Sequence, residues 1–257
     1  MGRYYTFSKD ALLQPRELHA LQNPPAGYSD IENSLHVVAE VWKVAISDAT
    51  KERWHRALHW SRALDMLLDE SDVADPLDHY LHLTAALSPD PWMPNSETSR
   101  IVPDACTWAN ITRASFEDGD VSNEHRRQMH ATAITLGKVS TNKQTTTTIK
   151  EYIRTCKAEG ALVADMLMDC MADDERQAPR AEPMREYFRQ WGKVNTLADS
   201  KDDFVEDAAN GIVQVPCDDK TFGILKRAAT WQENKLFLCW PKRTTQAAQM
   251  LTSLHKH

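Results

Sequence analysis

Three aspartates, Asp199, Asp203 and Asp207, are spaced four residues apart in a segment that is predicted to be helical. Residues four apart lie on one helix face, so the three carboxylates share a stripe. Like charges at this spacing repel, and a partly buried carboxylate needs a compensating cation. Mg²⁺ suits this role because it takes a few carboxylates and completes its octahedron with water and phosphate oxygens. The stripe therefore predicts a magnesium site for a phosphate-bearing ligand.

A second predicted helix, from about residue 51 to 70, repeats this design. Trp54 and Leu58 lead along one stripe to Asp65, Asp69 and Asp72. Two such helices facing each other across a bundle would form a pocket that is acidic at its mouth and apolar below. The alternative interpretation is that each cluster is a solvated helix surface. Two clusters of matching polarity favour the metal site.

Helices must position these stripes, and the composition favours an all-α fold. Glycine, with 8 residues in 257, is scarce, while good helix formers recur in long stretches. We expect one domain over residues 1–257, with an N-terminal arm over about 1–30. Loops are predicted at 88–103 and 173–183, and Gly211 fits the position just past a helix end. The expected helices span about 31–46, 51–70, 75–87, 104–116, 121–138, 149–171 and 184–210, with two shorter ones in 218–257 separated near Pro241.

Charge and cysteine content limit the partners. The net charge of −7 argues against nucleic-acid binding, which depends on clustered Lys and Arg. No apolar run approaches the roughly 20 residues of a membrane span, so at most peripheral membrane contact is expected. Five cysteines without CxxC spacing predict reduced thiols in a cytoplasmic protein and no zinc site. A homodimer is compatible with these features.

Three segments resemble the squalene/phytoene synthase family, a branch of the all-α isoprenoid synthases. The clearest is 203–216, DFVEDAANGIVQVP, which resembles the family's second aspartate motif: DxxED, three residues, a glycine and a short extended segment ending in proline. Residues 62–69, RALDMLLD, resemble the first motif, an arginine three residues before DxxxD. Residues 158–167, AEGALVADML, are similar to the family's glycine-containing helix that lines the cavity.

This resemblance implies an isoprenoid synthase-type helical bundle around a central cavity. It also implies Mg²⁺-assisted departure of diphosphate from a prenyl diphosphate, leaving an allylic carbocation shielded from water. The implied metal ligands are Asp65, Asp69, Asp203 and Asp207, with Asp199 added by its place on the same stripe. The implied substrate contacts are Arg62 and, on the helix that resembles the cavity wall, Gly160. Arg154 and Lys157, just before Gly160, are predicted to contact the diphosphate because such side chains are common at phosphate sites, with an ordinary solvated helix face as the alternative.

The chain also departs from the family pattern. Asp199 and Asp202 stand where the family commonly has Asn and Arg, and Ile212 and Gln214 replace the usual Arg and Tyr after the glycine. The four-residue spacing of the aspartates also resembles the second metal motif of terpene cyclases. Three alternatives therefore stay open: joining of two prenyl diphosphates, cyclisation of one, or a catalytically inactive helical relative that serves as a binding protein.

Overall fold

The computed structural model describes residues 13–22, 29–69 and 73–239, and these residues form helices and no strand. The all-α prediction is therefore confirmed. The helices are α1 (Pro15–Gln22), α2 (Ser29–Trp42), α3 (Asp48–Asp69), α4 (Pro76–Thr84), the 3₁₀ segment η2 (Ala85–Leu87), α5 (Ser96–Ile101), α6 (Pro103–Ala114), α7 (Asn123–Thr145), α8 (Ile149–Asp169), α9 (Asp173–Arg176), α10 (Ala181–Ala209) and α11 (Asp219–Cys239).

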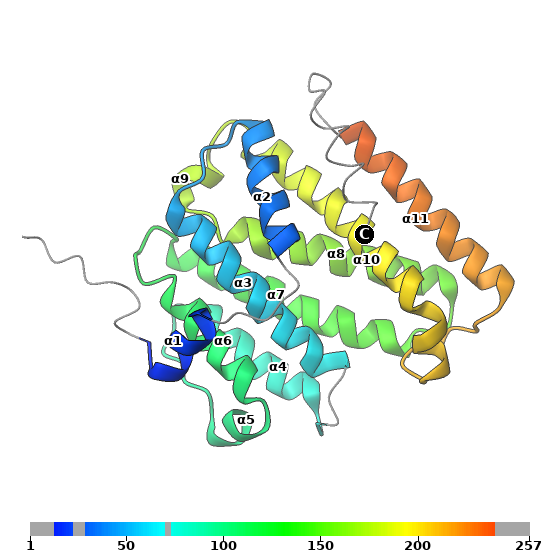
Figure 1. Ribbon diagram of the computed structural model, residues 1–257, viewed down its shortest axis with the longest axis horizontal. Coiled ribbons are helices and arrows are strands. Elements are labelled where there is room, and N and C mark those ends of the chain that lie inside the picture. Colours follow the sequence, from blue (N-terminus) through cyan, green and yellow to red (C-terminus); the bar gives the residue numbers. More distant parts are fainter. Residues whose placement is uncertain (1–12, 23–28, 70–72, 240–257) are drawn as a thin grey trace, which may run out of the picture.

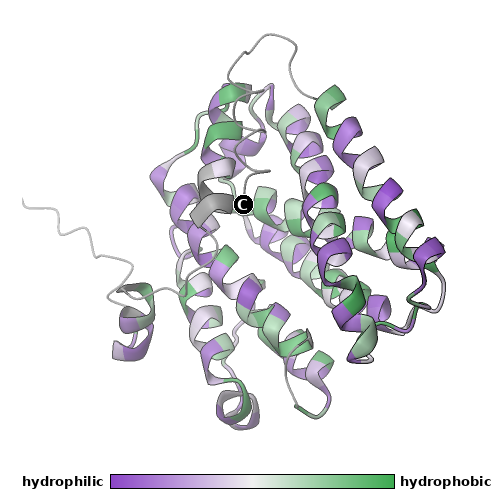
Figure 2. Cartoon of the chain, turned by 45° about the vertical axis from the view of Figure 1, so that its right-hand side comes forward, coloured by the Kyte–Doolittle hydropathy of each residue, from purple (hydrophilic) through white to green (hydrophobic). Residues whose placement is uncertain are grey.

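The four longest internal helices organise the molecule. In Figure 1, α3 and α10 run in the same general direction on the near side, with α7 and α8 behind them. α2 contacts both α3 and α10, whereas α11 packs on α10 and α8 at the outer edge. α1, α5 and α6 gather beside the other flank of α3. Hydrophobic and hydrophilic residues alternate around the long helices (Figure 2), as expected for helices with one buried face.

The first turn of α3 is fixed by residues far along the chain. Glu175 accepts hydrogen bonds from the Ser47 backbone N–H at 2.5 Å and from the Thr50 hydroxyl at 2.6 Å. Arg53 is fully buried, donates to the Cys170 carbonyl at 2.6 Å and pairs with Asp120 at 2.8 Å. A buried charge needs such partners, so this network sets the position of α3 against the end of α8.

Two glycines let α8 and α10 approach closely. A Cβ placed on Gly160 would lie 2.2 Å from the Gly192 carbonyl oxygen, and one on Gly192 would lie 2.1 Å from the Gly160 carbonyl oxygen. Backbone therefore meets backbone at this crossing, which only glycine permits. α8 runs through Gly160 without a break, from Ile149 to Asp169, close to the predicted helix over 149–171.

Buried side chains form a main core and a smaller second one. The main core includes Trp54, Trp60 and Phe188, all at most 1% exposed. The second core lies where α8, the C-terminal half of α10 and α11 meet, and it includes Tyr152 and Phe204, whose rings are 5.7 Å apart. The C-terminal half of α10 is thus anchored separately from its N-terminal half.

Most predicted boundaries agree with the structure, with local differences. The predicted loop at 88–103 contains α5, which begins where the Asn95 side chain accepts from the Thr98 N–H at 2.7 Å. The predicted loop at 173–183 contains the single turn α9, and α7 extends to Thr145 instead of ending near 138. The second helix expected in the tail lies outside the described residues.

The structure also bears on two predictions, reduced cysteines and the absence of a membrane-spanning helix. All five cysteines are free thiols. In the described part of the chain, no helix is long and apolar enough to cross a membrane.

Candidate acidic site

The predicted stripe on α10 changes from buried to exposed along the helix. Met184 and Phe188 are at most 1% exposed, whereas Asp199 and Asp203 are exposed to solvent and Asp207 is partly buried. The aspartates therefore lie on the same helix face as the buried apolar residues, but beyond the part of α10 that packs in the main core. The apolar start of the stripe faces inward as expected, whereas the exposure of Asp199 and Asp203 agrees with the alternative interpretation, a solvated helix surface.

Asp199 lies in crowded surroundings although water reaches it. Burial by the neighbouring protein raises the pKa of its carboxyl, and the negative charges of Asp203 and Glu159 raise it further, while Lys143 acts in the opposite direction. Water therefore reaches Asp199 although neighbouring protein atoms crowd its carboxyl. Its excess negative charge is the condition that a cation relieves.

Glu159 on α8 is a buried member of this group that the sequence did not single out. Its carboxylate accepts from the Ser140 hydroxyl at 2.5 Å and from the Lys143 ammonium at 3.0 Å, both on α7. The side chain of Glu159 is 9% exposed and that of Lys143 is 17% exposed. This pair places one positive and one negative charge between α7 and α8, facing the Asp199 side of α10.

Tyr80 on α4 connects Glu159 with the acidic end of α3. Its hydroxyl donates to the Ala133 carbonyl at 3.0 Å, and burial raises its pKa, followed by the charges of Glu159 and Asp65. Asp65 and Glu159 thus act on the same buried phenol, and Glu159 also acts on Asp199. We call Asp65, Glu159, Asp199 and Asp203 the acidic site, a name that rests on these shared charge effects, since no three acidic side chains of the described residues are close enough to hold one ion.

The α3 side of the site is only partly described. Arg62 and Asp65, both partly exposed, form an ion pair at 3.5 Å, so the predicted diphosphate contact lies beside the first predicted ligand. Asp69 ends α3, but its side chain lies outside the described residues, as does Asp72.

Arg154 and Lys157 lie on other faces of α8. Arg154 is exposed and pairs with Glu151 at 2.8 Å, one turn earlier on the same helix. The Lys157 ammonium lies 4.8 Å from the ring centre of Trp231 on α11, and its pKa is lowered by burial and by Lys235 and Lys193. The structure therefore brings neither side chain together with the acidic site, and Gly160 serves the contact with α10.

After α10 ends, the chain from Gly211 to Pro216 packs on the second core through every other residue. Gly211 has φ of 75°, the left-handed conformation predicted for the helix end. Val213 and Val215 are buried in the second core, while Gln214 between them is exposed. The two buried valines therefore hold the end of α10 in place. Ile212 and Gln214 are uncharged and stand where the squalene/phytoene synthase family has Arg and Tyr.

The donor chemistry of the acidic site fits Mg²⁺, although no metal cage is preformed. Carboxylate oxygens are its preferred protein ligands, and the pKa of Asp199 is raised first by burial and then by the negative charges of Asp203 and Glu159. Among residues 13–22, 29–69 and 73–239, however, no three His, Cys, Asp or Glu side chains are close enough to hold one ion. Mg²⁺ commonly uses one or two carboxylates plus substrate phosphates, so the arrangement fits binding together with a diphosphate.

Comparisons with protein-family models, with curated proteins and with solved structures found no match. Sequence motifs and geometry are therefore the basis for any assignment. Sequence reasoning missed Ser140, Lys143 and Glu159, and the available signal was weak. Ser140 and Lys143 share a face of α7, but only the folded structure shows that both donate hydrogen bonds to Glu159 on α8.

Proposed function

We propose that this chain is a class I isoprenoid synthase-like enzyme that binds a prenyl diphosphate through Mg²⁺ and promotes departure of the diphosphate. The observation on which this depends is the acidic end of α10, where the charges of Asp203 and Glu159 both act on the Asp199 carboxyl. The resemblance of residues 203–216 to the second aspartate motif supports it, as does the all-α architecture. The finer expectation, a bundle around a central cavity in a cytoplasmic enzyme, belongs to the same proposal.

Each part of the site has a role in this function. Asp199, Asp203 and Asp207 on α10, and Asp65 and Asp69 on α3, would hold Mg²⁺ between the two helices. Bound there, Mg²⁺ supplies the positive charge that stabilises the departing diphosphate.

The neighbouring side chains would orient and balance these carboxylates. Arg62 keeps Asp65 in place and offers the diphosphate further N–H donors. Lys143 offsets the charge of Glu159 and lowers the repulsion felt by Asp199.

The test is release of diphosphate from geranyl, farnesyl and geranylgeranyl diphosphates in the presence of Mg²⁺. We expect release from at least one substrate and a loss of about 100-fold or more in Asp203→Asn, the size seen when one group that stabilises a transition state is removed. Asp202→Asn is the matched control, because Asp202 is 68% exposed and pairs with Lys201 off the stripe. No release from any substrate by the folded protein, or equal rates in the two variants, would refute the proposal.

A second candidate is a helical binding protein without catalytic activity. Two observations favour it: no three acidic side chains in the described structure form a metal cage, and Ile212 and Gln214 are uncharged. This candidate predicts that prenyl diphosphates bind without being consumed. Analysis of the hydrocarbon product, where one forms, separates joining of two substrates from cyclisation of one.

A further inference from the structure

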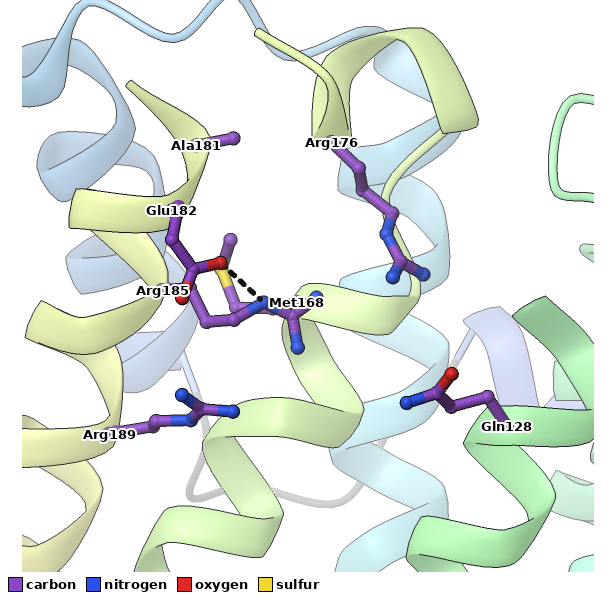
Figure 3. Close-up of a pocket in the computed structure, with 7 residues that line it drawn as sticks. All are labelled: Gln128, Met168, Arg176, Ala181, Glu182, Arg185 and Arg189. Atoms are coloured by element: carbon purple, nitrogen blue, oxygen red, sulfur yellow. Dashed lines mark ion pairs between the residues drawn. The ribbon is translucent and has the colours of Figure 1, made fainter. Parts of the chain in front are cut away.

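A small pocket lies at the opposite end of α10 from the acidic site. It has a volume of about 250 Å³ and is lined by one side chain of α7, one of α8, one of α9 and four of α10. We call it the arginine pocket; its lining residues are Gln128, Met168, Arg176, Ala181, Glu182, Arg185 and Arg189 (Figure 3). Arg189 precedes Asp203 by fourteen positions on a continuous helix, a separation of roughly 21 Å. The two sites are therefore separate.

The arginines of the pocket outnumber the carboxylates that hold them. Asp165 accepts from Arg189 Nε at 2.8 Å and from Arg185 Nη1 at 3.1 Å, using the same oxygen. Asp169, which is almost fully buried, accepts from Arg185 Nη2 at 2.7 Å, and its same oxygen lies 3.3 Å from Arg176 Nη1. Two carboxylates thus face three guanidinium groups.

Two further carboxylates lie at the rim of the pocket and neutralise the arginines less. Glu182 is 76% exposed and lies 3.9 Å from Arg185, and Glu186 is 50% exposed and lies 3.8 Å from Arg189. Water screens ion pairs at such exposure, so they neutralise the interior of the pocket only weakly. Apart from these exposed carboxylates and Asp173, whose charge also acts on Arg176, three guanidinium groups face only the carboxylates of Asp165 and Asp169.

Hydrogen-bond donors remain available in the pocket. Arg176 Nη1 is buried and has no hydrogen-bond partner in the described part of the chain, since its approach to Asp169 lacks hydrogen-bond geometry. Figure 3 shows the Arg176 guanidinium, the Arg189 guanidinium and the Gln128 amide directed toward the same space from three helices. A buried donor without an acceptor is costly, and a bound anion would satisfy it.

The donor set selects the class of ligand. Guanidinium groups present paired N–H donors that match the oxygens of phosphate, and ionised partners give the stronger hydrogen bonds. A cation would be repelled, and only Met168 and Ala181 offer apolar surface. We propose that the arginine pocket binds a small anion of the phosphate class, held by Arg176, Arg189 and Gln128.

The test is titration calorimetry of the full chain with inorganic phosphate, at constant ionic strength set by chloride and with EDTA present. We expect saturable binding at one site, weakened about tenfold or more in Arg176→Gln through loss of a charge-assisted donor. Arg180→Gln removes the same charge from an exposed residue outside the pocket and should leave affinity within about twofold. Asp203→Asn should also bind phosphate as the wild type does, which keeps this result independent of the acidic site.

Two outcomes would overturn the proposal: no saturable binding by the folded wild-type chain, or equal affinity in Arg176→Gln and the wild type. Circular dichroism establishes that each variant is folded. If Arg176→Gln does not fold, Gln128→Ala replaces it, because Gln128 is exposed on α7. Unchanged affinity in that variant would count against the pocket in the same way.

Discussion

The buried carboxylate of Glu159 links side chains from neighbouring helices. It joins α8 to Ser140 and Lys143 of α7 and faces the acidic end of α10. A buried ion pair adds little net stability, but removing one partner leaves the other charge without compensation. The pair therefore makes the position of α7 against α8 specific.

Glu159→Gln should lower the free energy of unfolding by about 2 kcal/mol, because Lys143 loses a charged acceptor while it stays largely buried. Urea unfolding followed by circular dichroism measures this. Lys143→Met in the same chain should restore part of the loss. Arg154→Gln, at an exposed helix position, should change stability by less than about 0.5 kcal/mol. Equal effects of Glu159→Gln and Arg154→Gln would contradict this account.

Asp199 should make the protein less stable as pH rises. Burial and then the charge of Asp203 raise the pKa of its carboxyl above the ordinary 3.8, so the folded state keeps this proton to higher pH than the unfolded chain does. Stability therefore falls as pH rises from about 3.8 through the folded pKa, and the loss persists at neutral pH.

Asp199→Asn should accordingly have a higher urea midpoint than the wild type at pH 7 without Mg²⁺, with the difference vanishing below pH 3.8. Urea titrations across this pH range check it. Asp202→Asn changes the net charge equally at an exposed position and should show at most a small part of the trend, because Asp202 is the last of the causes that raise the pKa of Asp199. A less stable Asp199→Asn at pH 7 would contradict the desolvation argument.

The crossing of α8 and α10 is the element contact that positions the acidic site. Gly160 lies next to Glu159, and Gly192 lies two turns before Asp199. Because backbone touches backbone there, the distance between these two helices is set by the absence of side chains.

Gly160→Ala should lower the free energy of unfolding by about 2 kcal/mol, since overpacking outweighs a gain of about 1 kcal/mol in helix propensity. Gly223→Ala is the matched control in α11, where the nearest atom to an added Cβ is the flexible Arg227 Nη1 at 3.6 Å, and it should be neutral or stabilising. Thermal and urea unfolding of both variants provide the comparison. A stabilised Gly160→Ala would mean that the crossing is looser than described.

At the level of the whole molecule, the proposed metal ligands come from opposite halves of the chain. α3 and α10 are joined through α2, α7 and α8. With no three acidic side chains of the described residues gathered around one point, metal and diphosphate should bind together rather than in sequence.

Mg²⁺ with inorganic diphosphate should therefore raise the melting temperature by more than the sum of the two separate shifts, because only ligands bound to the folded state stabilise it and diphosphate without Mg²⁺ can occupy only the arginine pocket. Differential scanning calorimetry measures this. Asp203→Asn should lose the joint effect, and Arg176→Gln should keep it, since the arginine pocket is separate. A full shift with Mg²⁺ alone would contradict the absence of a preformed cage.

The sequence by itself determined the helices and their faces. Periodicity depends on local geometry, so α3, α8 and α10 were predicted close to their observed bounds, and the stripe on α10 begins buried at Met184 and Phe188 as expected. The helix end at Gly211 was also local, because it depends on the left-handed φ that glycine adopts easily.

Only the tertiary structure decided which faces meet. Ser140, Lys143 and Glu159 come together because α7 packs on α8, and Arg154 and Lys157 face elsewhere because α8 is rotated to bring Gly160 onto Gly192. The arginine pocket likewise needs side chains from α7, α9 and α10 at once. Helical period fixes a residue's direction on its own helix, whereas its neighbour across the bundle depends on how all the helices pack together.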